Sequence, residues 1–290
     1  MNVLFITYPL SAILIFAMAL GLGLFLTHRF QLGWRLYWIG AAGFVLSQVG
    51  HIPFNFVATT LFQRGILPSP PTSWGPYFNP AFLGLSAGLW EEWVRYAIFR
   101  WWAKDARSWG KGLLLGAAHG GMEALIVGAI LLVSFIQLAT LRNADLSRII
   151  PPEQLAQTQQ SIQAYWSATW YDSMLGAVER LFSITVQVGL AILVLQAFTR
   201  GHIRWVWAAV LFHALVDFAS VYSIAHWGPY LTEALVGVFA LTSIAIIFVL
   251  RQPEPEPSSP EPIPPPDTVQ PIHLHPIEET PENLEKTRYN

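Results

Sequence analysis

Ionisable side chains stand in groups inside long apolar runs of this 290-residue chain. The groups are Glu91, Glu92 and Arg95, then His119 and Glu123, then His213 and Asp217. Residues three or four positions apart share one face of a helix, so each group points in one direction. A charged side chain at the centre of a membrane helix costs about 2.5–3.5 kcal/mol on insertion scales. Such residues are therefore rare and usually functional.

These side chains are suited to hydrolysis. Two histidine–carboxylate pairs on separate helices offer ligands to zinc or another divalent metal, and those candidate ligands are His119, Glu123, His213 and Asp217. Either glutamate of the adjacent pair supplies a base that activates water, while Arg95 holds one of the two ionised. In a metal-free version, His119 orients a group or relays a proton, and His213 with Asp217 stabilises an oxyanion. Both versions predict hydrolysis of an amide within the membrane.

Three further polar residues are candidates for a supporting role around this site. Glu179 lies on a small and polar stripe of the fifth apolar run. His51 and Asn55, four residues apart in the second run, share a helix face and are expected to line the site.

Composition indicates a membrane protein. Apolar residues make up 53% of the chain and charged residues 12%, about half the charged share of an average soluble domain. The 13 Trp and 18 Phe are typical of bilayer interfaces. A net charge of −2 gives no basic field to attract nucleic acid, so no nucleic-acid partner is expected. The absence of cysteine excludes disulfides, cysteine nucleophiles and iron–sulfur clusters.

The apolar runs predict an all-α, polytopic transmembrane helix bundle of about seven spans, placed as a multi-pass protein in the cell membrane. The runs cover roughly residues 4–27, 35–61, 78–101, 112–138, 165–198, 204–224 and 229–250. With the N-terminus outside, nine Lys or Arg residues fall in inside loops and three in outside loops. This bias predicts an N-out/C-in orientation.

The polar groups of three spans lie at a similar depth. His119, His213 and Glu92 are each eight or nine residues from the basic residue that marks the inside end of their span. At 1.5 Å per residue, all three lie about 12–14 Å from that boundary. We therefore expect one buried polar site nearer the inner leaflet, which suggests cleavage near the cytoplasm.

The chain divides into a helical transmembrane domain, residues 1–250, and a cytoplasmic tail, residues 251–290. The tail begins with a run rich in Pro and Glu and contains little that a core could bury, so it is predicted to be disordered. The Gln-rich outside loop near 140–164 is predicted to form a short surface helix before the fifth span.

The motifs resemble those of the YhfC family of intramembrane metalloproteases, which looks distantly related to the CAAX-processing and bacteriocin-processing (CPBP) membrane proteases. The resemblance covers roughly residues 1–250 and rests on Glu91-Glu92-Trp-Val-Arg95-Tyr96, His119-Gly-Gly-Met-Glu123-Ala124, Glu179-Arg180 and His213-Ala-Leu-Val-Asp217-Phe218. It implies that Glu91 or Glu92 activates water, that His119 is its catalytic partner or a ligand, and that His213 and Asp217 serve an oxyanion or a metal. The broader group places three residues between the second Glu and the Arg, whereas this chain has two.

The sequence is therefore interpreted as an intramembrane protease that cleaves a membrane-embedded or membrane-associated protein or peptide by Glu/His-activated water, with or without a metal. One alternative is a non-catalytic membrane protein, an ion- or proton-coupled transporter or a receptor, that uses the same polar cluster for binding. Another is a scaffold in which the polar pairs join helices. A scaffold would lose mainly stability when Glu92 is replaced, whereas a protease would lose turnover with its fold intact.

Overall fold

The computed structural model describes residues 2–253, and within this range the chain is helical, with no strand. The long helices are α1 (Leu4–Arg29), α2 (Trp34–Gln63), α3 (Gly75–Ala97), α4 (Trp109–Leu141), α5 (Pro152–Ser167), α6 (Leu175–Thr199), α7 (Arg204–Trp227) and α8 (Pro229–Val249). Short helical turns are η1 (Thr72–Trp74), η2 (Ile98–Trp102), η3 (Leu146–Arg148) and η4 (Asp172–Met174). The predicted disordered tail lies, from residue 254 on, outside the described residues.

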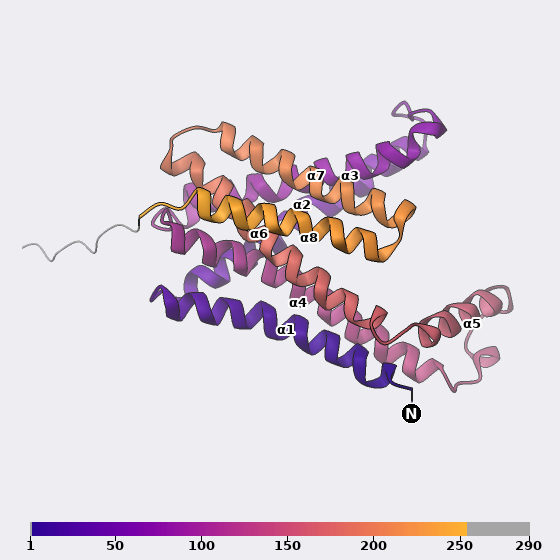
Figure 1. The fold of residues 1–290 in the computed structure, drawn as a ribbon. Coiled ribbons are helices and arrows are strands. Elements are labelled where there is room, and N and C mark those ends of the chain that lie inside the picture. The colour runs from indigo at the N-terminus through magenta and orange to yellow at the C-terminus, as the bar shows by residue number, and fades with distance from the viewer. Residues whose placement is uncertain (1, 254–290) are drawn as a thin grey trace, which may run out of the picture. The chain divides into compact units, whose positions relative to one another are not determined.

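Seven of these helices lie side by side and alternate in direction (Figure 1). At one end of the bundle, called the basic end here, α1, α3, α6 and α8 finish and α2, α4 and α7 begin. The basic residues predicted to lie inside the cell flank these helix ends. The opposite end, called the N-terminal end, carries the start of α1 and the α5 segment (Figure 1).

Within residues 2–253, five helices are long and apolar enough to cross a membrane: Leu4–Arg29, Trp109–Leu141, Asp172–Thr199, Arg204–Trp227 and Pro229–Val249. The other two bundle helices, α2 and α3, contain 30 and 23 residues. At 1.5 Å per residue, about 20 residues are enough to cross a bilayer. The count of seven spans and the N-out/C-in orientation stay predictions.

The predicted fifth span, 165–198, begins too early. Its first residues complete α5 and then form a turn, so that α6 starts at Leu175. The carboxylate of Asp172 accepts hydrogen bonds from the backbone N–H and the hydroxyl of Thr169, at 2.9 and 2.6 Å. Such local side-chain bonds favour a turn over a continuing helix. The predicted surface helix before this span is α5, which lies beyond the end of α4 and the beginning of α6 (Figure 1).

The helices that carry the polar groups approach closely because glycines face their neighbours. A Cβ atom on Gly84 would lie 2.6 Å from the backbone oxygen of Ala214, and one on Gly88 would lie 2.7 Å from that of Val210. These two glycines bring α3 against α7. On α4, a Cβ on Gly120 would lie 2.8 Å from the Gln187 side chain of α6. The small residues therefore let the polar faces of α3, α4, α6 and α7 meet.

We predict that Gly84→Ala lowers the free energy of unfolding in detergent by about 1–3 kcal/mol, because the added methyl group must push two backbones apart. The matched control is Gly21→Ala in α1, where a Cβ would meet nothing within 4 Å. This control should be neutral or stabilising by up to about 1 kcal/mol, since alanine is the better helix former. Thermal unfolding of the purified proteins measures both. Equal stability of the two variants would contradict the close approach of α3 and α7.

Candidate functional site

The adjacent glutamates of α3 have different partners. Glu92 and Arg95 are both fully buried, and Arg95 Nη1 donates to Glu92 Oε2 at 2.5 Å. Arg95 Nη2 donates to Gln187 Oε1 of α6 at 2.6 Å. Consecutive helical residues point about 100° apart, so Glu91 is turned away from Glu92 and its carboxylate meets other side chains. The arginine therefore pairs with Glu92, three residues before it, and leaves Glu91 to other groups.

Glu91 is bound from three other helices. His119 Nε2 of α4 lies 3.1 Å from Glu91 Oε2, and Gln187 Nε2 donates to the same oxygen at 3.2 Å. Gln48 Nε2 of α2 donates to the other oxygen, Oε1, at 3.0 Å. Together the three contacts hold both oxygens of the carboxylate in place. Glu91 is thus the meeting point of α2, α3, α4 and α6.

His213 of α7 is held between the two glutamates. Its Nδ1 lies 2.8 Å from Glu92 Oε1, and its Nε2 lies 3.9 Å from Glu91 Oε2 and 3.7 Å from Asp217 Oδ2. The bond to Glu92, whose charge Arg95 balances, fixes which ring nitrogen carries the hydrogen and how the ring is turned. His213 therefore presents Nε2 toward Glu91.

Glu123 and Glu179 belong to a second polar layer, centred on Arg180. Arg180 Nη1 donates to Glu123 Oε1 at 2.7 Å, and Arg180 Nε donates to Glu179 Oε2 at 2.6 Å. Gln187 Nε2 lies 3.1 Å from Glu123 Oε2 and so links this layer to Glu91. Glu123 stands beside Arg180 and Gln187, whereas His119, its partner in the sequence pattern, meets Glu91.

His51 and Asn55 lie next to the site on α2. His51 Nδ1 is 3.2 Å from Gln48 Oε1, and its Nε2 is 2.8 Å from Asn55 Nδ2 and 3.1 Å from Ser86 Oγ. Because the Gln48 oxygen faces His51, its NH₂ group is directed at Glu91. The α2 polar residues therefore act on Glu91 through Gln48.

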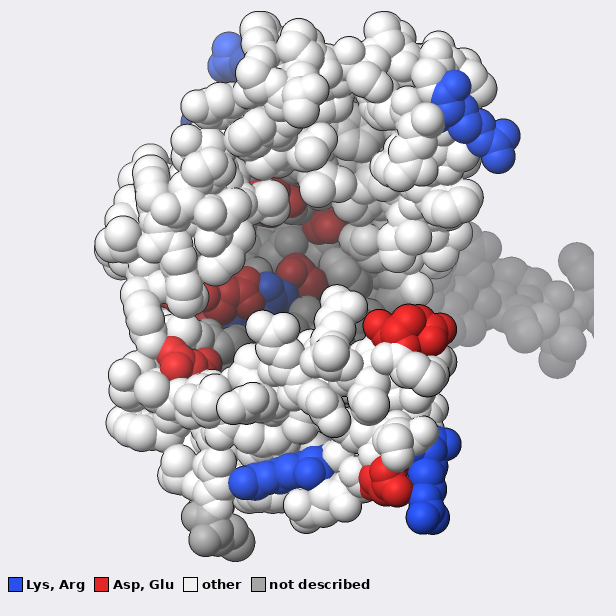
Figure 2. Space-filling view, turned by 90° about the vertical axis from the view of Figure 1, so that its right-hand side faces the viewer, with Lys and Arg blue, Asp and Glu red and all other residues white. Residues whose placement is uncertain are grey.

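A cavity of about 330 Å³ opens beside these groups. It is lined by His51, Leu83, Ala87, Glu91, Glu123, Glu179, Arg180, Ser183, Val186, Gln187, His213, Val216, Asp217, Ser220, Val221 and Val236. Figure 2 shows acidic and basic side chains inside a hollow of the surface, apart from the charged side chains at the periphery of this face. Glu91 lines this cavity, whereas Glu92, Arg95 and His119 lie behind its wall.

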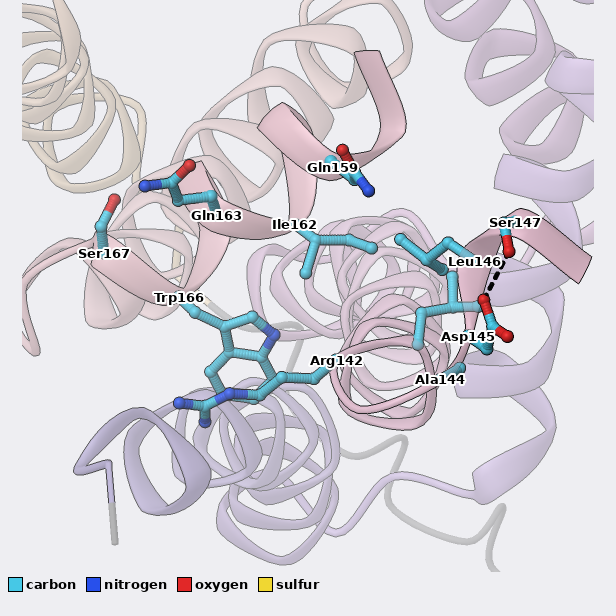
Figure 3. A pocket seen from close by; sticks show the side chains of 11 residues that line it. Arg142, Ala144, Asp145, Leu146, Ser147, Gln159, Ile162, Gln163, Trp166 and Ser167 are labelled. Carbon is cyan, nitrogen blue, oxygen red and sulfur yellow. Dashed lines mark hydrogen bonds between the residues drawn. The ribbon is translucent and has the colours of Figure 1, made fainter. Parts of the chain in front are cut away.

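A second hollow, of about 600 Å³, lies between α5 and the end of α4 (Figure 3). There the guanidinium of Arg142 stacks on the ring of Trp166, 4.7 Å from its centroid, and Asp145 accepts a hydrogen bond from Ser147. Its charged groups are thus already engaged. None of the predicted site residues lines it, so the cavity beside Glu91 is the candidate site.

The donor types at Glu91 are those of a metal site, although their spacing is not. The described residues contain no group of three or more His, Asp or Glu side chains arranged to hold a metal ion. Two imidazole Nε2 atoms, of His119 and His213, nevertheless face one oxygen of Glu91, at 3.1 and 3.9 Å. Two histidines and one glutamate are the protein ligands of a common type of catalytic zinc site. These donor types, two imidazoles beside carboxylates, therefore fit a divalent metal in chemistry.

Two glutamines complete the site that the charged residues indicated. Gln48 and Gln187 both donate to Glu91 and were not among the predicted site residues. Their sequence signal is weak, because neutral amides occur in many membrane helices. Gln48 precedes His51 by three residues, and Gln187 follows Glu179 by eight, so each lies on the same helix face as a predicted residue.

Comparison with known proteins places this arrangement in a family. The chain matches the family model described as "YhfC intramembrane metalloprotease" over residues 13–243. It is 28% identical to the "Uncharacterized membrane protein YhfC" of Bacillus subtilis (strain 168) over 232 residues, which cover 73% of this chain and 82% of that relative. No solved structure matches the chain. These matches and the five candidate spans indicate a multi-pass membrane protein, and they confirm the resemblance that the motifs suggested.

We predict that Arg95→Met lowers the free energy of unfolding by about 3–5 kcal/mol, because it leaves the buried Glu92 without a counter-charge. The double variant Arg95→Met/Glu92→Gln should recover part of this loss. Arg148→Met is the matched control, since Arg148 pairs with Asp145 at the same three-residue spacing but in an exposed position. It should cost less than about 1 kcal/mol. Chemical unfolding in detergent measures all three, and a single variant as stable as the native protein would rule out the buried pair.

Proposed function

Because the chain belongs to the YhfC family of intramembrane metalloproteases, we propose that it hydrolyses a peptide bond of a membrane-embedded or membrane-associated protein. The observation that carries this proposal is the position of Glu91. Of the two adjacent glutamates, Glu91 lines the cavity, while Glu92 is enclosed with Arg95. Glu91 is therefore the base, and Glu92 holds the groups around it.

The proposed reaction uses Glu91 to take a proton from a water molecule in the cavity. The hydroxide oxygen forms a bond to the peptide carbonyl carbon, and the carbonyl oxygen gains the negative charge. The C–N bond then breaks, and Glu91 returns the proton to the departing amine. Gln48, Gln187 and His119 keep the two oxygens of Glu91 in place throughout, which limits the reorganisation that the reaction requires.

His213 has two candidate roles, and both use its Nε2 atom. In the first, the ring carries a hydrogen on both nitrogens: Nδ1–H stays with Glu92, and Nε2–H donates to the oxyanion, with Asp217 beside it at 3.7 Å. In the second, His119, His213 and Asp217 would hold zinc or another divalent ion, and Glu91 would stay the base. A bound ion would supply a Lewis acid and lower the pKa of bound water. Glu92 keeps the ring oriented in either case.

Glu123, Glu179, His51 and Asn55 are proposed to support the reaction rather than to take part in it. Glu123 and Glu179 neutralise Arg180, and Arg180 lines the cavity. Through Gln48, His51 and Asn55 determine which end of an amide faces Glu91. The four residues thus maintain the charge and the hydrogen-bond direction of the site.

We predict that Glu91→Gln abolishes cleavage while the protein still folds, with a loss of at least about 100-fold because the general base is gone. Mass spectrometry of new N-termini in membrane proteins, in cells with the native or the variant chain, gives the readout. Fragments that depend on the native chain should vanish. The matched control is Glu233→Gln on α8, a glutamate that does not line the cavity. Cleavage that persists in Glu91→Gln would remove Glu91 as the base, and an absence of native-dependent fragments would overturn the protease proposal.

We predict about one equivalent of zinc or a similar divalent ion in the purified native protein, as a catalytic zinc site requires. His119→Ala and His213→Ala should both lose it. The control is His202→Ala, which changes an exposed histidine at the basic end. Elemental analysis of the detergent-purified proteins decides the matter without a substrate. Folded native protein that contains no such ion, after purification without chelators, would leave His213 with the oxyanion role.

A further inference from the structure

From the site, the cavity extends in one direction along α3, α6 and α7, the three helices that contribute most of its lining residues. The lining residues fall within 83–91 on α3, 179–187 on α6 and 213–221 on α7. The residues of the site itself, Glu91, Gln187 and His213, stand at one limit of each range. The other limits point to the beginnings of α3 and α6 and to the end of α7. All three of these helix ends belong to the N-terminal end of the bundle (Figure 1).

On the other side of the site the interior is filled. Phe99 lies one turn beyond Arg95, and Leu115 lies one turn before His119, both toward the basic end. These two side chains are fully buried and belong, with Leu190 of α6, to one apolar cluster. None of the described residues that line the cavity lies on this side. The hollow in Figure 2, seen from the end drawn on the right in Figure 1, is the open side of the site.

The basic end is the cytoplasmic end under the positive-inside rule. The depth of the polar groups alone suggested an approach from the cytoplasm, because they lie nearer that end. The cavity, however, leads away from it. The depth of the polar site therefore does not tell from which side it is reached, because packed apolar side chains close the shorter path to the basic end.

The path from the N-terminal end to the site is polar. From Leu83 to Glu91 the cavity extends over eight residues of α3, which is about 12 Å. Its walls carry Ser183 and Ser220 as well as charged groups, so water can enter with a substrate segment.

We propose that substrates reach Glu91 from the non-cytoplasmic side of the membrane, along the cavity that leads there. This inference rests on the proposed protease function and specifies its substrate class: membrane proteins or peptides with a cleavable segment exposed on that side.

The direction of access can be measured without a substrate. The chain contains no cysteine, so Ser220→Cys and Ser183→Cys each place one thiol in the cavity wall. A small charged methanethiosulfonate, which does not cross membranes, is added to intact cells and to inverted vesicles. We expect both thiols to react in intact cells and to be protected in sealed inverted vesicles.

Two exposed positions calibrate the sides. Ser147→Cys lies at the N-terminal end and His202→Cys at the basic end. The first should react in intact cells and the second only in inverted vesicles. Cavity thiols that follow the His202 control, or that react from neither side while both controls react, would overturn the proposed access. An exchange of sides between the two controls would overturn it as well.

None of these readings depends on turnover. An inactive protein with the expected labelling would therefore reject the protease function alone, and an active protein with the opposite labelling would reject the access path alone.

Discussion

A guanidinium that is fully buried among membrane helices determines the arrangement of this site. A guanidinium donates hydrogen bonds and accepts none, so the surroundings of Arg95 must balance its charge and accept its hydrogen bonds. Glu92 provides the counter-charge and Gln187 a further acceptor. Glu92 is thereby committed to a structural partner. The neighbouring Glu91, one residue earlier on the same helix, is left to face the cavity.

The position of Arg95 and Glu92 also orients neighbouring side chains, because a glutamine or histidine side chain bound through one polar atom has its other polar atom placed as well. Because the Gln187 oxygen accepts from Arg95, its NH₂ group is turned toward Glu91 and Glu123. His213 is ordered in the same way: its Nδ1 meets Glu92, which leaves its Nε2 toward Glu91. Gln48 of α2 is oriented in the same way: its oxygen faces His51, and its NH₂ group donates to Glu91. The charge of one arginine and the direction of a few hydrogen bonds thus hold the carboxylate of Glu91 in place, which suits the role of general base that we propose for it.

The fold brings the helices of the candidate site close together and leaves a cavity beside Glu91. Gly84 and Gly88 bring α3 against α7, and Gly120 brings α4 against α6. Side chains of α4, α6 and α7 can therefore approach the carboxylate of Glu91 on α3. Such contacts suit a bilayer, where close packing and hydrogen bonds between helices replace the hydrophobic effect. Between the site and the N-terminal end the helices surround a polar cavity, whereas between the site and the basic end apolar side chains fill the interior. The bundle is therefore sealed at its basic end and open at the other.

The sequence by itself determined the helical fold and the family, and it predicted the charged residues of the candidate site, because apolar runs and residues three or four apart report on a single helix. It misplaced the start of α6, since the bond between Asp172 and Thr169 is a local detail that hydropathy does not register. Only the tertiary structure decided the pairing: Arg95 with Glu92, and His119 with Glu91 instead of Glu123. Helical spacing shows which residues share a face, whereas the partner across the interface depends on how neighbouring helices are rotated and how closely they pack.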